Sequence, residues 1–305
     1  MEEKIEILVF SDVHYSMDTR IEEARWWPPA ERILPEKIAL KYLQRIDGQT
    51  QKCFYAMLKQ ASSLASGSKL FDCILELGDG TPGTNQRGII TQKAVEERLF
   101  YKKVIDNVFP GTKKKFLWGN HDTGFYSKST AIISLNSQIG YMSKKSYDSA
   151  KKFIGSPWQS FKLGNFVFLL LNSEIIRASR SAVSPDRSFF KQQELKQEEF
   201  IKDVLNNCSE KIILAIHDPS KLEFLLPILK NHKDRICLTL AGHYHALSQE
   251  QIRSKFPWGE KINFTKIIPN TWGGILERHK LFNGKGGFAI LELSGDSINL
   301  ELHHL

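Results

Sequence analysis

Five short apolar blocks along the chain predict buried strands. They lie at Ile5–Phe10, Cys73–Leu77, Phe116–Trp118, Ile212–Ile216 and Ile236–Ala241. Each block is rich in Val, Ile, Leu or Phe and lacks the alternation of apolar and polar residues that marks a strand with one wet face. Such continuous apolar runs are typical of strands that are covered on both faces, as in α/β proteins. The pattern therefore predicts an α/β fold.

The long segment between the first two blocks, about residues 15–72, is predicted to be a helical insertion. Near its start, Trp26-Trp27 is followed by two prolines, which cannot continue a helix. Pro35 suits the first turn of a helix, and Gly48 is predicted to end that helix. Apolar residues at helical spacing predict a second helix at about residues 51–65. Trp26 and Trp27 either form an apolar wall for a substrate or pack the insertion onto the sheet.

The remaining pattern completes the predicted architecture. Residues 93–106 have the spacing of a helix, and the polar stretch at about 127–160 is a candidate cap that faces a substrate. Two hairpins are predicted, one turning at Gly164-Asn165 and one at Gly295-Asp296. Two clusters of strands with helices between them predict a two-sheet β-sandwich flanked by helices, in a single domain over residues 1–305.

Polar residues follow each of the five apolar blocks. They are Asp12 and His14, then Asp79, then Asn120, His121 and Asp122, then His217, and finally His243 and His245. The carboxyl ends of strands in open α/β sheets meet at one crevice, where ligands bind. Asp, His and Asn without Cys suit one or two divalent transition metals. Taken singly, each of these residues could equally cap a helix, line a turn or be a satisfied polar group.

In this order the motifs closely resemble those of the calcineurin-like metallophosphoesterase family, from Asp12 to His245. The resemblance implies a four-layer α-β-β-α fold. One departure is local: the run Gly78–Gly83 lacks the second Asp or Asn that the family usually carries shortly after the Gly-Asp pair. This departure concerns the shape of that loop more than metal binding, because Asp79 itself is present.

The resemblance also implies a ligand set for two divalent metal ions. Asp12, His14 and His245 would hold one ion, Asn120, His217 and His243 would hold the other, and Asp79 would bridge them. Carboxylate and imidazole ligands are compatible with Mn, Fe, Zn, Ni or Co, and the sequence does not choose among them.

The implied reaction is hydrolysis of a phosphate ester, either a monoester or a diester, by a hydroxide that the two metals activate. His121 would protonate the leaving group, since a histidine can exchange a proton near neutral pH. Asp122 would hydrogen-bond His121 or a ligand imidazole, or else cap a helix. Arg177 and Arg180 are candidate contacts for the substrate phosphate; alternatively they form ion pairs with Glu174 and Asp186.

The composition indicates which classes of substrate and partner are expected. The net charge of +8 favours anionic substrates in general. A nuclease of the same superfamily is the alternative, although no arginine stripe interleaved with aromatics is visible. A non-catalytic binding module of the same fold would be expected to have lost ligands, and this chain has lost none.

The sequence also carries expectations about location and redox state. No apolar run reaches the roughly 20 residues that span a bilayer, and the first residues lack the pattern of a signal peptide, so a cytoplasmic protein is expected. The four cysteines are scattered and are expected to be buried free thiols. Lys113-Lys114-Lys115 is interpreted as a solvated entry to the third strand.

Overall fold

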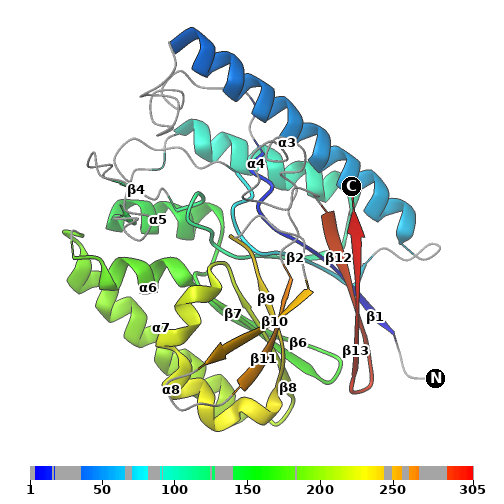
Figure 1. The fold of residues 1–305 in the computed structure, drawn as a ribbon, viewed down its shortest axis with the longest axis vertical. Helices are drawn as coiled ribbons and strands as arrows, with labels where there is room; N and C mark the ends of the chain where they lie inside the picture. The colour runs from blue at the N-terminus through cyan, green and yellow to red at the C-terminus, as the bar shows by residue number, and fades with distance from the viewer. Residues whose placement is uncertain are drawn as a thin grey trace.

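Two β-sheets pack face to face, and helices cover their outer faces (Figure 1). The computed structural model describes residues 4–15, 17, 36–65, 71–81, 90, 92–123, 126–127, 140–182, 184–243, 249–255, 261–267 and 287–304. The layers run helix, sheet, sheet, helix. The predicted four-layer α/β sandwich is therefore confirmed.

The first sheet has five strands in the order β13-β12-β1-β2-β3. Strands β1, β2 and β3 are parallel, and the C-terminal hairpin adds β12 antiparallel to β1. The strand bounds are β1 Ile5–Phe10, β2 Cys73–Glu76, β3 Lys113–Phe116, β12 Gly287–Ser294 and β13 Ser297–His304.

The second sheet has four strands in the order β6-β7-β8-β9. The hairpin β6-β7 is antiparallel, whereas β7, β8 and β9 are parallel. The strand bounds are β6 Gln159–Leu163, β7 Phe166–Leu171, β8 Lys211–Ile216 and β9 Ile236–Ala241. Both predicted hairpins are present, turning where the sequence predicts.

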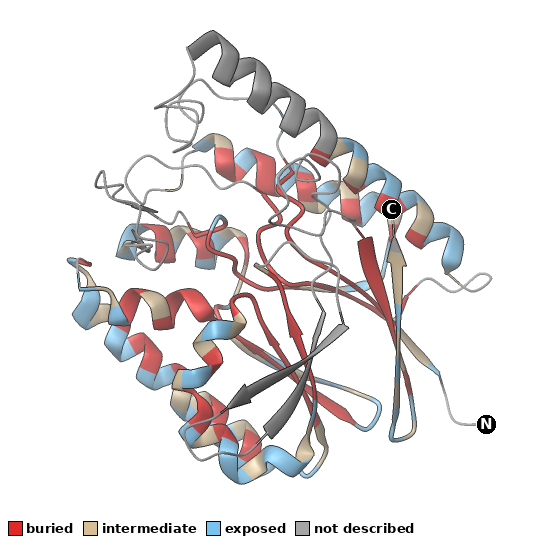
Figure 2. Ribbon diagram, viewed as in Figure 1, coloured by how far each residue is buried: buried red, intermediate tan, exposed pale blue. Residues whose placement is uncertain are grey.

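The core between the sheets is formed by alternate residues of their facing strands. Ile7 and Val9 of β1 pack in one cluster with Phe168 and Leu170 of β7 and with Leu240 of β9. The residues between them point outward and pack under the helices, as Figure 2 shows by the red strands at the centre of the molecule. Burial on both faces explains why these strands are apolar throughout.

Two groups of helices cover the sheets. Phe54 of one helix and Tyr101 of another pack on Leu8 and Phe10 of the first sheet, while Ile201 packs on the second sheet. The first group is α3 Glu36–Leu64, α4 Gln92–Val108 and α5 Lys144–Phe153, and the second is α6 Ser173–Arg180, α7 Arg187–Asn207 and α8 Leu226–Leu229.

Smaller elements complete the described chain. Two short helices of the 3-10 type flank α8, and two further pairs of strands form small sheets of their own. They are η1 Pro219–Phe224, η2 Lys230–Arg235, β4 Tyr126–Ser127 with β5 Gly140–Tyr141, and β10 Gln249–Lys255 with β11 Lys261–Ile267. No helix within the described ranges is long and apolar enough to cross a membrane.

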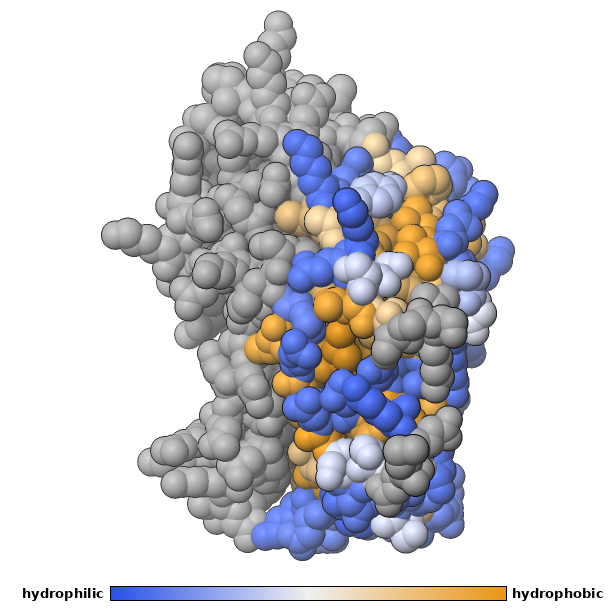
Figure 3. Space-filling view, turned by 90° about the vertical axis from the view of Figure 1, so that its right-hand side faces the viewer, coloured by the Kyte–Doolittle hydropathy of each residue, from blue (hydrophilic) through white to orange (hydrophobic). Residues whose placement is uncertain are grey.

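The edge strand β13 leaves part of the inter-sheet core near the surface. Ile298, Leu300 and Leu302 alternate along it, are half-buried and pack against the core. On the side of the molecule shown in Figure 3, apolar patches accordingly lie among polar side chains.

Two local predictions were wrong. Gly48 does not end a helix, because α3 continues through it to Leu64; a mid-helix glycine costs only about 1 kcal/mol, and the packing of the following turns outweighs it. Lys113–Lys115 do not precede the third strand but form it, at the edge of the sheet. The candidate cap at about 127–160 stays a prediction; its described part includes the helix α5, which Tyr147 and Ala150 anchor in the core.

The cysteines are only partly as predicted. All four are free thiols, and Cys73 is buried in β2. Cys237, however, is exposed, because it lies on the outermost strand of the second sheet. Cys53 and Cys208 are half-buried.

Candidate metal centre

The polar residues after the five strands lie together at one edge of the two sheets. Backbone hydrogen bonds tie the loops to each other: the amide of His14 donates to the carbonyl of Asp79 at 3.0 Å, and the amide of Gly242 donates to the carbonyl of His217 at 3.0 Å. The first bond joins loops of the first sheet and the second joins loops of the second sheet. The loops therefore hold their side chains in a fixed arrangement.

Two groups of candidate metal ligands share one residue. His14, Asp79 and His121 form one group, and Asp79, His217 and His243 form the other, with ligand atoms within 4.8 Å of one another in each group. Asp79 belongs to both groups. A carboxylate with two oxygens can contact two ions at once, so its position fits a bridging ligand.

The second oxygen of Asp79 supports this fit. Its Oδ2 atom is buried and has no hydrogen-bond donor, although it lies 3.2 Å from Nε2 of His217 and 3.9 Å from Nε2 of His14. A buried oxygen that lacks a hydrogen bond is costly unless something else satisfies it. A divalent cation between these atoms would do so.

Asn120 completes the second group. Its Oδ1 atom lies 3.2 Å from Nε2 of His217 and 2.9 Å from Nδ1 of His243. An amide oxygen and two imidazole nitrogens that converge in this way are suitable ligands for a transition metal. The structure thus brings together the predicted ligands His14, Asp79, Asn120, His217 and His243. The carboxylate of Asp12 belongs to neither group of ligand atoms; it accepts hydrogen bonds from the amide of His243 at 2.9 Å and from Oγ of Ser11 at 2.6 Å. His245 lies outside the described residues.

The backbone at the site is strained in a consistent way. Within the described ranges, the non-glycine residues with positive φ are Asp12, His14, Asp79 and His243, at 53°, 47°, 56° and 74°. This region of backbone conformation is unfavourable for residues with a Cβ atom, and it is retained mainly where function requires it. All four are predicted metal ligands.

Gly119 allows the loops after β2 and β3 to approach each other. A Cβ atom at this position would collide with the carboxylate and the backbone nitrogen of Asp79. Glycine is therefore required for the Asn120 loop to lie against the bridging carboxylate.

The charges of Asp79 and His217 depend on each other. Burial opposes ionisation of Asp79, but the imidazoles of His217, His121 and His14 outweigh it and hold the pKa of its carboxyl well below the usual range. Burial likewise opposes the charge on His217, but Asp79 and Asp12 raise its pKa well above the usual value. If a metal ion bound to His217, it would have to displace the proton that this raised pKa favours, so binding would release protons.

His243 behaves in the opposite way. Burial, together with the nearby His217, lowers its pKa to about 4. Its ring is accordingly neutral at pH 7, which is the form that binds metals.

His121 lies at the rim of the site. Its side chain is exposed, and its backbone amide donates to Oδ1 of Asp79 at 2.8 Å. Its ring lies edge-on to that of His14, with 4.7 Å between the ring centroids. This position is open to a bound substrate and also within reach of the first ligand group.

Asp122 has a different set of partners from the one predicted. Its carboxylate accepts hydrogen bonds from the amides of Asp79 (2.7 Å) and Gly119 (3.0 Å) and forms an ion pair with Arg98 (3.1 Å). Among the described residues, no imidazole hydrogen-bonds to it. Asp122 therefore orients the two ligand loops themselves rather than a histidine ring.

The two arginines predicted to contact substrate are both ion-paired. Arg177 is bound by Asp218 at 2.7 Å and Glu174 at 3.4 Å, close behind His217. Burial opposes ionisation of Asp218, but His243 and Arg177 lower its pKa to about 2. Arg180 is bound by Glu194 at 2.7 Å.

These pairs agree in part with the alternative that the sequence left open. Glu174 is the partner of Arg177 that was named there. Asp186 instead accepts a hydrogen bond from the amide of Lys144, at the start of α5. Trp26 and Trp27 lie outside the described residues.

Sequence reasoning missed two residues at the site, Glu76 and Arg98. Both are buried, and they form an ion pair of 2.8 Å. The signal for Glu76 was its position within the apolar block Cys73–Leu77, since a glutamate in a strand buried on both faces needs a partner. Nothing in the sequence pointed to Arg98 as that partner.

The burial of Glu76 predicts a pH effect on stability. Burial raises its pKa to about 7 despite the neighbouring Arg98, and Asp122 adds to the rise. The folded state therefore retains a proton that the unfolded state releases above the ordinary value of 4.5, so stability falls as the pH rises from 4.5 towards 7.

We expect Glu76→Gln to remove this part of the pH dependence. Denaturant unfolding of the metal-free protein at about pH 5 and about pH 8 should show a smaller difference in the variant than in the wild type. An equal difference in both proteins would mean that Glu76 keeps the same charge throughout this range.

Comparison with known proteins agrees with this architecture. No family model and no curated protein matches the sequence. Among solved structures, a purple acid phosphatase from yellow lupin (Lupinus luteus) seeds matches with a TM-score of 0.53 and 12% identity, over 100% of this chain and 52% of that one. The chain has a calcineurin-like metallophosphoesterase fold.

Two weaker matches complete the comparison. Vacuolar Protein Sorting 29 from Cryptosporidium parvum has a TM-score of 0.38 and 11% identity, over 99% of this chain and 98% of that one. A Staphylococcus aureus protein described as a 5'-nucleotidase has a TM-score of 0.30 and 13% identity, over 99% and 53%. The chain spans about half the length of the lupin phosphatase. The chain therefore has the fold that it shares with the lupin phosphatase, with side chains that could hold metal ions at the ends of its strands.

Proposed function

We propose that the protein is a dinuclear metallophosphoesterase that hydrolyses a phosphate monoester or diester. The observation that carries this proposal is the position of Asp79. Its carboxylate is shared by two groups of candidate ligands, and one of its oxygens is buried without a hydrogen-bond donor. This is the arrangement that a bridging ligand between two cations requires.

The ligand set follows from the sequence resemblance and from this geometry. Asp79 would contact both ions, His14 and Asp12 would hold one of them, and Asn120, His217 and His243 would hold the other. We assign His245 to the first ion from the sequence. The metals are two divalent ions from among Mn, Fe, Zn, Ni and Co.

Each residue has a defined task in the proposed reaction. When bound, two divalent ions would lower the pKa of a water molecule and offset the charge of the phosphoryl group. The imidazoles and the amide are neutral when they act as ligands, so the loaded site attracts an anionic ester. His121, exposed at the rim, would transfer a proton from a ring nitrogen to the leaving-group oxygen as the ester bond breaks.

A rate measurement on paired substrates tests the proposal. With Mn added, the initial rates on nitrophenyl phosphate and on bis-nitrophenyl phosphate are compared, with the Asp79→Asn protein as a control for contaminating phosphatases. A preference for the monoester would indicate a phosphatase, and a preference for the diester would indicate a phosphodiesterase or a nuclease. Equal, background rates for the wild type and the control, with each metal of the set, would contradict catalysis and favour a binding module.

The second ligand group makes its own prediction. We expect His217→Ala to reduce Mn binding from two ions towards one, because it removes an imidazole whose Nε2 atom lies 3.2 Å from both Asp79 and Asn120. Isothermal titration calorimetry on the metal-free protein measures the stoichiometry. A retained stoichiometry of two would exclude His217 as a ligand. His232→Ala is the matched control, because this histidine lies on η2 and contacts Arg235.

A further inference from the structure

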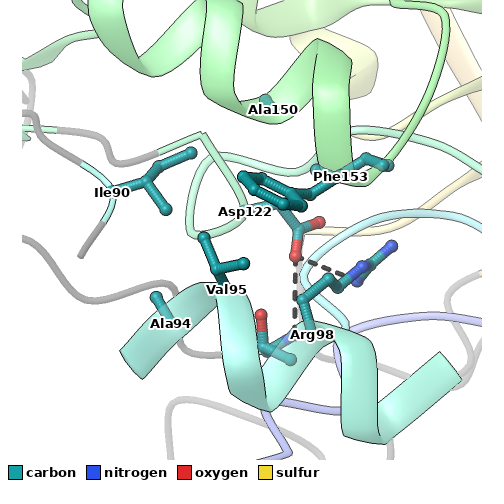
Figure 4. Close-up of a pocket in the computed structure, with 9 residues that line it drawn as sticks. Ile90, Ala94, Val95, Arg98, Asp122, Ala150 and Phe153 are labelled. Atoms are coloured by element: carbon teal, nitrogen blue, oxygen red, sulfur yellow. Dashed lines mark hydrogen bonds and ion pairs between the residues drawn. The ribbon is translucent and has the colours of Figure 1, made fainter. Parts of the chain in front are cut away.

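Arg98 lies behind the metal centre, buried between two carboxylates. It belongs to α4, and its side chain is only 4% exposed. Its Nη2 atom is 2.8 Å from Oε2 of Glu76, and its Nη1 atom is 3.1 Å from Oδ1 of Asp122. Figure 4 shows the contact between Arg98 and Asp122 on the side that faces α5. The guanidinium therefore links the strand β2 to the loop after β3.

Each of the two carboxylates holds a ligand loop through its other oxygen. Oε1 of Glu76 accepts from the amide of Gly78 at 2.9 Å. Oδ2 of Asp122 accepts from the amides of Asp79 and Gly119. Arg98 is thus connected to the backbone of both ligand loops through one carboxylate each time. Through Glu76 it reaches the amide of Gly78, and through Asp122 it reaches the amides of Asp79 and Gly119.

The surroundings make this linkage hard to replace. A cavity of about 20 Å³ adjoins the Arg98–Asp122 pair, and most of its other lining residues are apolar. They are Ile90, Ala94, Val95, Ala150, Phe153 and Ile154. A space of this size holds about one water molecule. Without the guanidinium, Glu76 and Asp122 would lose the donor that bonds them both, and the two loops would no longer be tied to each other through it.

We propose that Arg98 is a positioning residue for the metal centre. Through Glu76 and Asp122 it fixes the loop of Asp79 relative to the loop of Asn120 and His121. This inference rests on the proposed function, because it assigns Arg98 a task towards the same two ions. The planar guanidinium, with donors spread over a fork, is what allows one side chain to bond both carboxylates in fixed directions.

A purely structural role for Arg98 has a different consequence. If the arginine only offset the charge of Glu76 and Asp122, lysine would serve equally well, since it carries the same charge. If instead the forked guanidinium positions the loops, lysine cannot replace it, because a single ammonium group cannot bond both carboxylates in the same two directions. Arg98→Lys therefore separates positioning from charge compensation.

Mn binding by calorimetry and by electron paramagnetic resonance tests the proposal. In Arg98→Lys we expect the affinity for Mn to fall about 10- to 100-fold, the range seen when a partner behind a metal ligand is lost. The resonance signal of two coupled Mn ions should give way to that of isolated ions. Arg235→Lys is the matched control, because Arg235 bonds the carbonyl of Leu205 at 2.7 Å, in a different part of the fold.

A second variant tests the same point by chemical rescue. Arg98→Ala opens the existing cavity, and low millimolar guanidinium should restore Mn binding in this variant, whereas sodium chloride and urea should not. Circular dichroism before metal is added shows whether each variant is folded. If the alanine variant does not fold, the lysine variant still decides the question, because it retains the charge.

The possible results separate the two proposals. A wild-type protein that binds none of the candidate metals would overturn the proposed function. A wild type that binds two Mn ions, together with an Arg98→Lys variant that binds them with the same affinity and the same coupled signal, would overturn only the role of Arg98.

Discussion

Replacing Asp79 with asparagine is expected to lower the rate of phosphate-ester hydrolysis by at least about 100-fold, with loss of high-affinity metal binding. Loss of a residue that only supports a ligand already costs about 10- to 100-fold, and Asp79 is proposed to touch both ions. Asparagine has nearly the same size, so packing is retained while the negative charge is removed. One of the two carboxylate oxygens, of which Oδ2 faces the imidazoles of His217 and His14, is replaced by an amide NH2 group, which does not ligate a cation.

The measurement for Asp79→Asn combines the Mn stoichiometry with kcat/KM on the better of the two nitrophenyl substrates. Asp296→Asn is the matched control: the same substitution at a site where the side chain is 71% exposed, in the turn before β13. If the Asp79 variant bound two Mn ions and turned over at the wild-type rate, the bridging assignment would be wrong.

The sequence predicted the central strands well because their burial leaves a simple pattern. The blocks Ile5–Phe10 and Ile236–Ala241 match β1 and β9 residue for residue. Most positions of both strands face either the inter-sheet core or a helix, and Cys237 of β9 is the exposed exception. Local sequence is then sufficient, because almost every side chain must be apolar.

Local sequence failed where neighbours decide the structure. Gly48 has the conformational preference of a helix end, but Phe54, Met57 and Leu58 of the same helix pack on the first sheet, and this burial carries α3 through it. Lys113–Lys115 form β3 because they pair with β2, and charged residues are common on edge strands, where they discourage further pairing. Neither contact is visible from residues nearby in the sequence.

The candidate site likewise has a part that the sequence indicated and a part that it did not. The candidate ligands could be proposed from the sequence because each directly follows an apolar block, and topology alone brings such residues to one edge of the sheets. The support behind them could not be named, because Glu76, Arg98 and Asp122 come from a strand, a helix and a loop whose packing the sequence does not display. Arg98 forms buried ion pairs with Glu76 and Asp122, and these pairs depend on how the three elements pack in space.

Replacing His121 with alanine is expected to slow poor leaving groups far more than good ones. A positioned general acid contributes about 10²- to 10⁴-fold to rate, and that contribution is large only where the departing oxygen needs a proton. A nitrophenolate departs readily without one, whereas an alkoxide does not. The variant should therefore retain most activity on nitrophenyl phosphate and lose it on alkyl phosphates, and the rate should depend more steeply on leaving-group basicity.

The position of His121 also allows a second role, that of a metal ligand. Its ring is 4.7 Å from that of His14 and lies in the same group of ligand atoms as Asp79, so a ligand role is the alternative to acid catalysis. A ligand role predicts that His121→Ala loses one Mn ion and slows all substrates equally. An acid role predicts two bound Mn ions and a selective loss, because the backbone amide that donates to Asp79 is unchanged by the substitution. Measuring metal content and the leaving-group series on the same preparation distinguishes the two roles, since each fixes both results.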